Sequence, residues 1–457
     1  MNWTLAIAGI LSFAIAAPGR SGTDADPVSV KVTVSWGRPV ARTTERSFGI
    51  NLFSAFDPVV SADPGYRENL AFMGPGLVRF HSMEMMRDCA TPEGWLDTGA
   101  RKWDAEKIGR TLAWIPPGSE SIMNIPGWPD WMDADGDGFL DRDRYDEFAA
   151  FCSSLVRIVN GDLKRGIRYW EITNEKDAVY WSGPAERHEP DRVRDLAEIY
   201  NACAAAMKAV DPGIATGGPA AARGDLLAPL RRFALAVMPN LDFFTFHAYA
   251  GGDRMDSDRS VYERADGLGW MAGEAVRMLQ AESPSRRIPV FLDEFNIRET
   301  LDSRMAGSKG AVFDFIVLAG CARAGCDSAL SWNERGGIHG KTSPRGELRP
   351  GANVLRLFNR HMVGDAVDTQ SANPGRVSAL AVSSDARGER AVVAANRTGA
   401  SVLVRFDFLG WQPVSGGFSR HEITDTGCRE SEITFRELSA DGLVVPAHSV
   451  AFLVAKG

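Results

Sequence analysis

The 457-residue sequence has no excess of positive charge and few cysteines. Its 51 lysines and arginines are outnumbered by 59 aspartates and glutamates, which gives a formal net charge of −8. Because proteins that bind the phosphate backbone normally present a basic surface, nucleic acid is excluded as the expected partner. The six cysteines include no C-x-x-C pair, which argues against a structural zinc site.

Long hydrophobic runs are absent apart from one, LAIAGILSFAIAA at residues 5–17. This run is too short to cross a bilayer, and it contains small residues that a signal peptidase could recognise, so we predict a cleaved signal peptide at 1–17. No basic residue precedes the run, which leaves a buried N-terminal helix or an uncleaved anchor as the alternative. Signal cleavage would place the protein outside the cell or in the periplasm, with no membrane contact.

The rest of the sequence is typical of a soluble globular protein, because 44% of all residues are hydrophobic and 24% are charged. From residue 47, short apolar strands alternate with longer amphipathic helices, the pattern of a parallel sheet. Eight strands are predicted, which indicates the α/β class and a (β/α)₈ TIM barrel at residues 46–348. They are 47–54, 76–82, 121–126, 169–175, 214–220, 242–249, 288–297 and 328–334.

Strand patterns without intervening helices flank this barrel. Apolar and polar residues alternate at 28–40 and again at 376–384, 390–398, 401–409 and 443–455. The sequence therefore predicts a small antiparallel β-sandwich at 349–457, joined by an N-terminal strand within residues 28–45.

Polar and aromatic side chains gather at the ends of the predicted barrel strands. In a TIM barrel the carboxyl ends of the strands and the loops after them carry the active site. Carboxylates, amides and aromatic rings are the groups that a sugar-binding site requires. The candidates are Arg79, His81, Asn124, Trp128, Asn174, Glu175, His247, Tyr249, Glu294 and Trp332.

Two of these candidates, Glu175 and Glu294, end the fourth and seventh strands. A retaining glycosidase needs two carboxyl groups about 5–5.5 Å apart, one as acid/base and one as nucleophile. These two strand ends lie across the barrel mouth and can bring the groups to that distance. A solvated carboxylate or an ion-pair partner is the alternative for either residue alone.

The segments YWEITNEKDAVYW, FHAY and FLDEFN, with the trailing β-sandwich, resemble clan A glycoside hydrolases and most of all glycoside hydrolase family 39. That family includes β-xylosidases and α-L-iduronidases. The resemblance covers residues 45–457 in architecture, although Thr173 stands where the commoner clan motif has Trp before Asn-Glu. It implies Glu175 as acid/base, Glu294 as nucleophile, and no required cofactor.

The chemistry of this assignment sets expectations for the neighbouring residues. Arg79 would keep Glu294 ionised, whereas Glu175 would start protonated through weak solvation or repulsion by Glu294. Asn174 would bind the sugar 2-hydroxyl. The remaining candidates would bind sugar or orient the nucleophile, with Trp332 under a sugar ring, and barrel packing is the alternative for each.

An Asp-rich loop follows the third strand. Residues 133–141 read DADGDGFLD, with acidic side chains at positions 1, 3, 5 and 9 of an EF-hand-type loop and Gly at position 6. Position 12 is Arg144, where such loops have Glu, and no flanking helices are evident. We predict a structural calcium site at Asp133, Asp135, Asp137 and Asp141, with a polar surface turn as the alternative.

The leading functional prediction is an exported retaining glycoside hydrolase that acts on oligo- or polysaccharides, such as a β-xylosidase-like exo-enzyme. One alternative is an endo-acting clan A glycanase, which would need an open groove. The other is a carbohydrate-binding protein that keeps the barrel without turnover.

Overall fold

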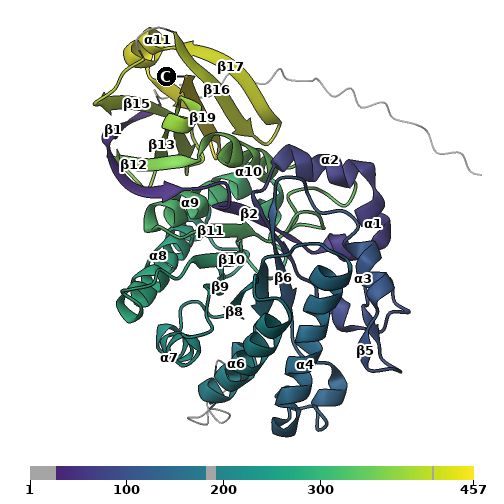
Figure 1. The fold of residues 1–457 in the computed structure, drawn as a ribbon. Helices are drawn as coiled ribbons and strands as arrows, with labels where there is room; N and C mark the ends of the chain where they lie inside the picture. Colours follow the sequence, from purple (N-terminus) through teal and green to yellow (C-terminus); the bar gives the residue numbers. More distant parts are fainter. Residues whose placement is uncertain (1–26, 182–191, 414–415, 457) are drawn as a thin grey trace, which may run out of the picture.

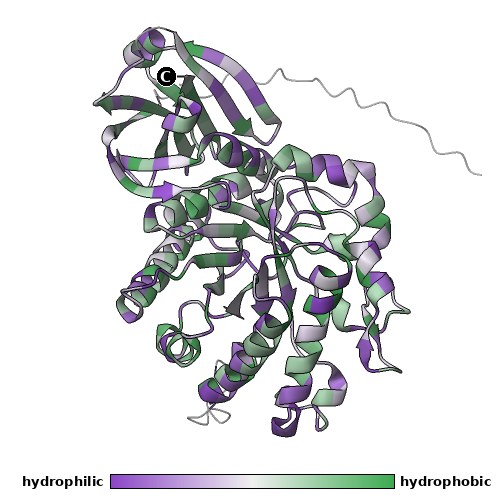
Figure 2. Ribbon diagram, in the orientation of Figure 1, coloured by the Kyte–Doolittle hydropathy of each residue, from purple (hydrophilic) through white to green (hydrophobic). Residues whose placement is uncertain are grey.

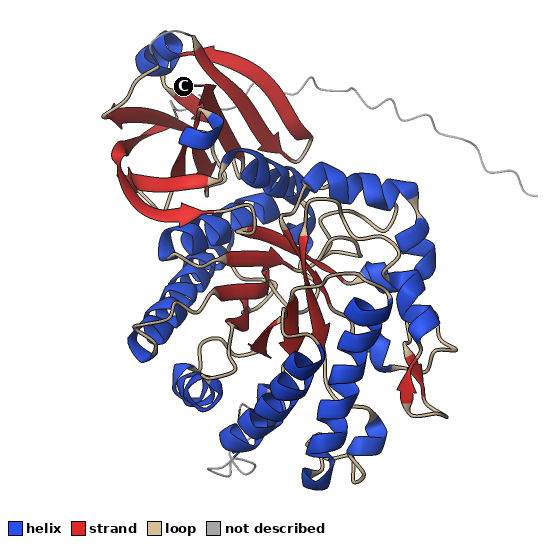
Figure 3. Cartoon of the chain, in the orientation of Figure 1, coloured by secondary structure: helices blue, strands red, loops and turns tan. Residues whose placement is uncertain are grey.

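The computed structural model describes residues 27–181, 192–413 and 416–456, so the predicted signal peptide lies outside the described residues. Eight parallel strands close a barrel, which confirms the predicted TIM-barrel fold (Figures 1 and 3). In barrel order they are β2 (Phe48–Leu52), β3 (Leu77–Phe80), β6 (Glu120–Ile125), β7 (Tyr169–Ile172), β8 (Ala215–Ala221), β9 (Phe243–Tyr249), β10 (Val290–Asn296) and β11 (Ser328–Ser331).

Helices surround the barrel and carry hydrophobic and hydrophilic residues along their lengths (Figure 2). Their buried side is apolar, as in α4, where Phe148, Cys152 and Leu155 lie in the core. The helices that follow the strands are α1 (Pro58–Ala62) with α2 (Pro64–Met73), α3 (Ala105–Thr111), α4 (Tyr145–Val156), α6 (Arg192–Val210), α7 (Leu227–Val237), α8 (Asp258–Glu282), α9 (Ser308–Ala324) and α10 (Pro350–His361). No helix among the described residues combines the length and the apolarity needed to cross a membrane.

The barrel interior is layered, because alternate residues of each strand point inward. The layer nearest the amino ends of the strands is an apolar cluster of Leu77, Ile122, Tyr169, Phe243, Phe291 and Leu330. The next inward-facing residues, two positions further toward the carboxyl ends of the strands, are polar and fully buried. They are Asn51, Arg79, Asn124, Glu171, Thr245 and Asp293. This polar layer lies directly beneath the predicted site.

A separate nine-stranded sheet forms the second domain, in the order β17-β16-β19-β14-β13-β12-β1-β15-β18. Its strands are β1 (Val28–Thr43), β12 (Gly364–Ser371), β13 (Val377–Ser384), β14 (Glu389–Asn396), β15 (Val402–Leu409), β16 (Gly417–Thr424), β17 (Gly427–Thr434), β18 (Leu443–Val445) and β19 (Val450–Lys456). A short helix, α11 (Phe435–Asp441), leads into β18. Because β1 runs parallel to β15, the sheet is mixed and not wholly antiparallel as predicted.

The strand at 28–43 comes from the far end of the chain, and Figure 1 shows it in purple within the green and yellow strands of this domain. The sheet has two apolar faces. One packs on the barrel, where Phe452 meets Phe358 of α10 with ring centroids 5.8 Å apart. The other encloses a second core that contains Val32, Val392 and Phe408.

The structure differs from the sequence prediction at the domain boundary. Helix α10 packs against α2 and α9 and follows β11, so it is the eighth barrel helix, although it lies beyond residue 348. The β-domain resumes only at β12. The predicted strand at 443–455 is two strands, β18 and β19, separated by a turn that contains Pro446.

Candidate active site

Glu175 lies in a tight turn just after β7. Both Thr173 and Glu175 have positive φ angles, 69° and 53°, which non-glycine residues seldom adopt. Three backbone hydrogen bonds hold this turn, among them Glu175 N to Ala220 O at 2.9 Å. Strained backbone of this kind persists where surrounding contacts fix it, commonly at functional sites. The turn directs the Glu175 side chain, 41% exposed, toward the barrel mouth.

Glu294 reaches the site through an irregularity in β10. The pairing of β10 with β9 shifts register between Leu292 and Glu294. Strict alternation would place Asp293 and Glu294 on opposite faces, but this bulge brings both next to Arg79. Bulges beside active sites commonly re-aim a side chain in this way. Glu294 is 6% exposed and accepts a hydrogen bond from the Tyr249 hydroxyl.

The two glutamates converge as predicted. One carboxylate oxygen of Glu175, one of Glu294 and a ring nitrogen of His247 all lie within 4.8 Å of one another. This spacing suits a retaining double displacement and is too short for an inverting mechanism, whose carboxyl groups are about 6.5–9.5 Å apart. A divalent cation could geometrically fit these three groups, but the nearby Arg79 and a protonated His247 oppose its charge.

Arg79 organises the base of the site. It donates to Glu171 Oε2 at 2.7 Å, to Asn174 Oδ1 at 2.7 Å and to Asn51 Oδ1 at 3.0 Å, and contacts Glu294 Oε2 at 3.4 Å. The side chain has no exposed surface. Burial lowers the pKa of Arg79, but the charges of Glu171, Asp293 and Glu294 raise it further, so the guanidinium is permanently charged. The predicted proximity of Arg79 to Glu294 is present.

Beneath the glutamates lies a second carboxyl pair, Glu171 and Asp293. Both are fully buried, and Glu171 Oε1 and both oxygens of Asp293 accept no hydrogen bond from the described residues, although Arg79 Nε lies 3.3 Å from Asp293 Oδ2. Burial and the charge of Glu171 hold the pKa of Asp293 well above its ordinary value, whereas Arg79 keeps the pKa of Glu171 low against the effect of burial. Asp293 is therefore the member of the pair that holds a proton more readily, and in its protonated form its hydroxyl can donate to Glu171 Oε1.

The protonation of the catalytic pair differs from the sequence-based expectation. Burial raises the pKa of Glu175, but a hydrogen bond from His247 Nδ1 (2.8 Å) and the charges of His247 and Arg79 outweigh it, so the pKa is lowered. Burial raises the pKa of Glu294, and the charges of His247 and Arg79 do not offset it. The expected order, an ionised Glu294 and a protonated Glu175, is thus reversed in the free protein, because His247 sits against Glu175.

His247 carries the charge that causes this reversal. Burial lowers its pKa, but the charges of Glu294 and Asp293 and the bond to Glu175 raise it to about 10. Four carboxyl groups therefore face two cations, Arg79 and His247. A proton on Asp293 and a second proton on Glu175 or Glu294 would leave this cluster without net charge.

Other predicted residues form the wall of the site. His81 Nδ1 lies 2.7 Å from Asn124 Oδ1, and Asn124 donates to Glu171 Oε2 at 2.7 Å. Burial and the charge of Arg79 hold the pKa of His81 well below its ordinary value, so this ring is neutral. Trp332 is half-buried and packs against His81, with ring centroids 5.7 Å apart.

Trp128 does not join this wall. Its side chain is 7% exposed, packs edge-on against Phe148 and Tyr180, and has the Lys176 ammonium 4.1 Å above its ring. The structure therefore gives Trp128 a packing role where the sequence suggested a sugar contact.

The Asp-rich loop brings together three of its four predicted ligands. One oxygen each from Asp133, Asp135 and Asp141 lie within 4.8 Å of one another. Asp137 is not in this group, and its side chain accepts from the backbone of Phe139 at 2.9 Å. Three carboxylates at this spacing are oxygen ligands of the kind that calcium takes. Calcium binding stays a prediction.

Sequence reasoning missed several residues of the site. Glu171 shares an inward face with Thr173 in the sequence pattern, and this was the signal that could have found it. Asp293 was not predicted, because strict alternation from an inward-facing Glu294 would place Asp293 on the outer face of β10. Glu334 ends the eighth predicted strand but was given no role. It lies just beyond β11 and accepts hydrogen bonds from Phe53 N, Ser54 N and Tyr66 Oη, which fixes the loop that holds Phe53 edge-on against Trp332.

Glutamates converging from the fourth and seventh strands of a TIM barrel, the first of them after an asparagine, form the arrangement that a retaining glycosidase requires, and in this the chain is similar to clan A glycoside hydrolases. Residues 171–314 match the sequence model of glycosyl hydrolases family 39, and this segment contains both glutamates. The match confirms the predicted resemblance. A comparison with curated proteins finds no match.

Solved structures of glycosidases share the fold. A bifunctional glucanase-xylanase from a metagenome library has 16% identity and a TM-score of 0.66, over 93% of this chain and 99% of that one. A family 51 α-L-arabinofuranosidase from Bifidobacterium longum has 14% identity and a TM-score of 0.65 over the same shares. A monomeric β-xylosidase from Caulobacter crescentus CB15 has 15% identity and a TM-score of 0.63, also over 93% and 99%.

Proposed function

We propose that this protein is an exported retaining glycosidase that releases sugars from the non-reducing ends of oligo- or polysaccharides, with β-xylosides as the first candidate substrates. The observation that carries the proposal is the convergence of Glu175 and Glu294 around His247 within 4.8 Å. The β-xyloside preference rests on the family 39 match and on the β-xylosidase among the similar structures.

In the first step, a Glu294 oxygen attacks the anomeric carbon while Glu175 transfers its proton to the glycosidic oxygen. The bond from the anomeric carbon to that oxygen breaks, and the leaving sugar departs as an alcohol. In the second step, Glu175 takes a proton from water, the water oxygen attacks the anomeric carbon, and Glu294 is released as a carboxylate. Tyr249 and Arg79 hold Glu294 throughout by the contacts described above.

Substrate binding supplies the protonation order that the free protein lacks. Glu175 is the solvent-exposed member of the pair, so a bound sugar removes water from Glu175 more than from Glu294. Desolvation of a carboxylate raises its pKa. The shared proton then moves toward Glu175, and Glu294, held by Tyr249 and Arg79, becomes the ionised nucleophile.

Asn174 and Trp332 are proposed to hold the sugar. Arg79 donates a hydrogen bond to Asn174 Oδ1. This bond fixes the orientation of the amide, so that its NH₂ group can donate to the sugar 2-hydroxyl. The half-buried ring of Trp332 offers an apolar face for a sugar ring.

The test is hydrolysis of aryl glycosides by the mature protein. The panel contains β-xyloside, β-glucoside, β-galactoside, α-L-arabinofuranoside and α-L-iduronide, and nuclear magnetic resonance identifies the first-formed anomer. Glu294→Gln should abolish turnover of every substrate. Glu175→Gln should slow substrates with poor leaving groups by about 10²–10⁴-fold and those with good leaving groups far less. The exposed Glu198 of α6 provides a matched control, Glu198→Gln.

Each alternative has its own outcome in this experiment. Turnover of polysaccharides from internal positions, with no activity on aryl glycosides, would favour an endo-acting glycanase. Binding of oligosaccharides without turnover, unchanged in Glu294→Gln, would favour a carbohydrate-binding protein. Sequencing the amino terminus of the exported protein tests signal cleavage near residue 17.

A further inference from the structure

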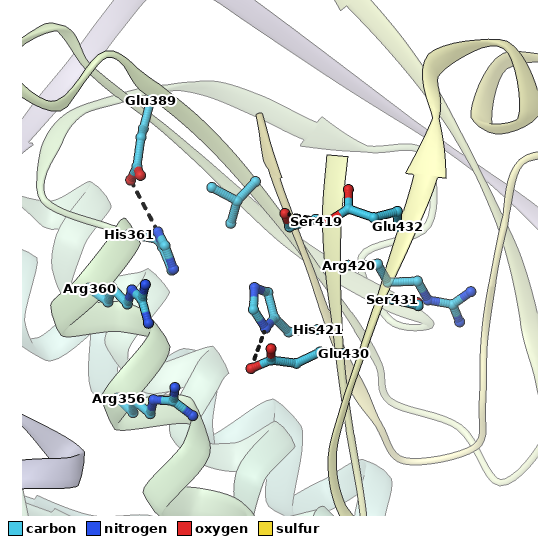
Figure 4. A pocket seen from close by; sticks show the side chains of 11 residues that line it. Arg356, Arg360, His361, Glu389, Ser419, Arg420, His421, Glu430, Ser431 and Glu432 are labelled. Carbon is cyan, nitrogen blue, oxygen red and sulfur yellow. Dashed lines mark hydrogen bonds and ion pairs between the residues drawn. The ribbon is translucent and has the colours of Figure 1, made fainter. Parts of the chain in front are cut away.

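A second cavity lies at the junction of the barrel and the β-domain, far along the chain from the glutamates (Figure 4). We call it the junction cavity. It has a volume of about 510 Å³ and lies between α10 and strands β14, β16 and β17. Its basic side chains are Arg356, Arg360 and His361 of α10 and Arg420 and His421 of β16. Val454 is its one apolar lining residue among the described part of the chain.

The carboxylates of the junction cavity already have partners. Glu389 lies 3.1 Å from His361 Nδ1, and Glu430 lies 3.4 Å from His421 Nδ1, as the dashed lines of Figure 4 show. Glu432 accepts a hydrogen bond from Ser419 at 3.0 Å. Arg420 is likewise paired, with Glu422. These contacts leave the guanidinium groups of Arg356 and Arg360 as the lining cations without a carboxylate partner among the described residues.

The two remaining charges are Arg356 and Arg360, one helical turn apart on the same face of α10. Neither forms an ion pair with any residue in the described ranges. The Arg356 guanidinium lies 4.6 Å from the centre of the Phe72 ring, a contact that holds it in place without neutralising it. The junction cavity therefore contains two guanidinium groups with unused donors.

The two histidines of the junction cavity can add to this positive charge. Their side chains are 8% and 11% exposed, and their ring centroids are 5.9 Å apart. Burial and the charge of Arg360 lower the pKa of His361, and burial with the charges of Arg356 and Arg360 lowers the pKa of His421. An anion between them would reverse that effect. The charged groups that face the histidines are Arg356, Arg360, Glu389, Arg420, Glu430 and Glu432.

We propose that the junction cavity binds a carboxylate-bearing sugar, whose carboxylate is held by Arg356 and Arg360. Guanidinium groups bind oxoanions through paired, charge-assisted hydrogen bonds. The volume lies within the range of small-molecule sites, about 300–1,000 Å³, and leaves space beyond the anion for a sugar ring. Free phosphate shares the oxoanion chemistry and is the other source of ligand. This site is separate from the catalytic centre and does not depend on its function.

The experiment is isothermal titration of the whole protein with trigalacturonate, its neutral methyl ester and inorganic phosphate. Trigalacturonate should bind and the ester should not, and binding should weaken with added salt and strengthen between pH 8 and pH 5.5 as the histidines gain protons. Arg360→Gln should weaken binding about tenfold or more, and Arg356→Gln with Arg360→Gln should abolish it. Arg376→Gln, an exposed arginine outside the cavity, is the matched control.

Arg360 is exposed, so its replacement should leave folding and glycoside hydrolysis unchanged. Binding of phosphate alone, sensitive to the same arginines, would retain the oxoanion site and overturn the sugar assignment. Absence of binding by both anions, or binding that is equal in the wild-type protein and the double variant, would overturn the proposal.

Discussion

The raised pKa of Asp293, which lies beneath Glu175 and Glu294, leads to a sharp comparison between two variants, Asp293→Asn and Glu171→Gln. Asparagine has the shape of a protonated aspartate and can donate to Glu171 as the acid does. We therefore expect Asp293→Asn to change the free energy of unfolding by less than about 1 kcal/mol. Glu171→Gln instead leaves Arg79 buried without its closest carboxylate, and breaking a buried pair in this way costs about 3–5 kcal/mol.

The pH dependence of stability separates the two variants further. The pKa of Asp293 is higher in the folded than in the unfolded protein, so the folded state binds more protons above the ordinary aspartate pKa of about 4. The wild-type protein should consequently lose stability relative to Asp293→Asn as the pH rises above about 4. Urea denaturation followed by tryptophan fluorescence between pH 4 and pH 8 measures this difference.

The same variants should differ in catalysis. Glu171 contacts Arg79, which in turn contacts the proposed nucleophile Glu294. As a positioning residue for that nucleophile, Glu171 should lower kcat and shift the pH profile when it is replaced. Asp293→Asn should keep kcat/KM within about threefold, below 1 kcal/mol of transition-state stabilisation. If Asp293→Asn costs as much stability and activity as Glu171→Gln, Asp293 is ionised and the assignment is wrong.

Three other predictions concern single groups. Tyr249→Phe removes the hydrogen bond from the Tyr249 hydroxyl to the proposed nucleophile Glu294, and such a bond to a charged group is worth about 1.5–3 kcal/mol. The value of kcat should therefore fall about 10- to 150-fold with little change in melting temperature. An unchanged kcat would show that Tyr249 does not support the nucleophile. Burial raises the pKa of Glu334 to about 7, so the wild-type protein should lose up to about 3 kcal/mol of stability as the pH rises from about 4.5 to 7. Glu334→Gln should make the free energy of unfolding less dependent on pH over this range. The same pH dependence in both proteins would contradict the raised pKa. Calcium should raise the melting temperature of the wild-type protein but not of Asp141→Asn, whereas equal melting in calcium and in a chelator would leave the loop as a polar turn.

The barrel could be predicted because its strands are buried on both sides and interrupted by amphipathic helices, which leaves eight short apolar segments in the sequence. The location of the site could be predicted from the same pattern, because a TIM barrel brings the residues at the carboxyl ends of its strands together. Strands without a regular alternation of apolar and polar residues were not predicted. The β16–β17 hairpin, for example, has mostly polar residues on one strand and buries only Phe418, His421 and Ile423 of the other.

What the sequence could not supply are properties that depend on several strands at once. The inward position of both Asp293 and Glu294 needs a bulge, and alternation along one strand does not encode it. The order of protonation depends on His247, which comes from β9 and lies against Glu175 of the β7 turn. A strand-by-strand reading can locate each carboxyl group but not the charges around it.

The position of β1 has a consequence for how the chain is made. Val28 pairs with Val402, 374 residues later, and Val32 pairs with Ser371. At a synthesis rate of roughly 5–20 residues per second, this strand waits about 20–75 s after leaving the ribosome before its second neighbour exists. Until β12 is made, this valine-rich strand has two open edges, and one edge stays open until β15 follows, which is a hazard for aggregation. A chain released early, before β15 is made, would keep that strand exposed even if its barrel were complete.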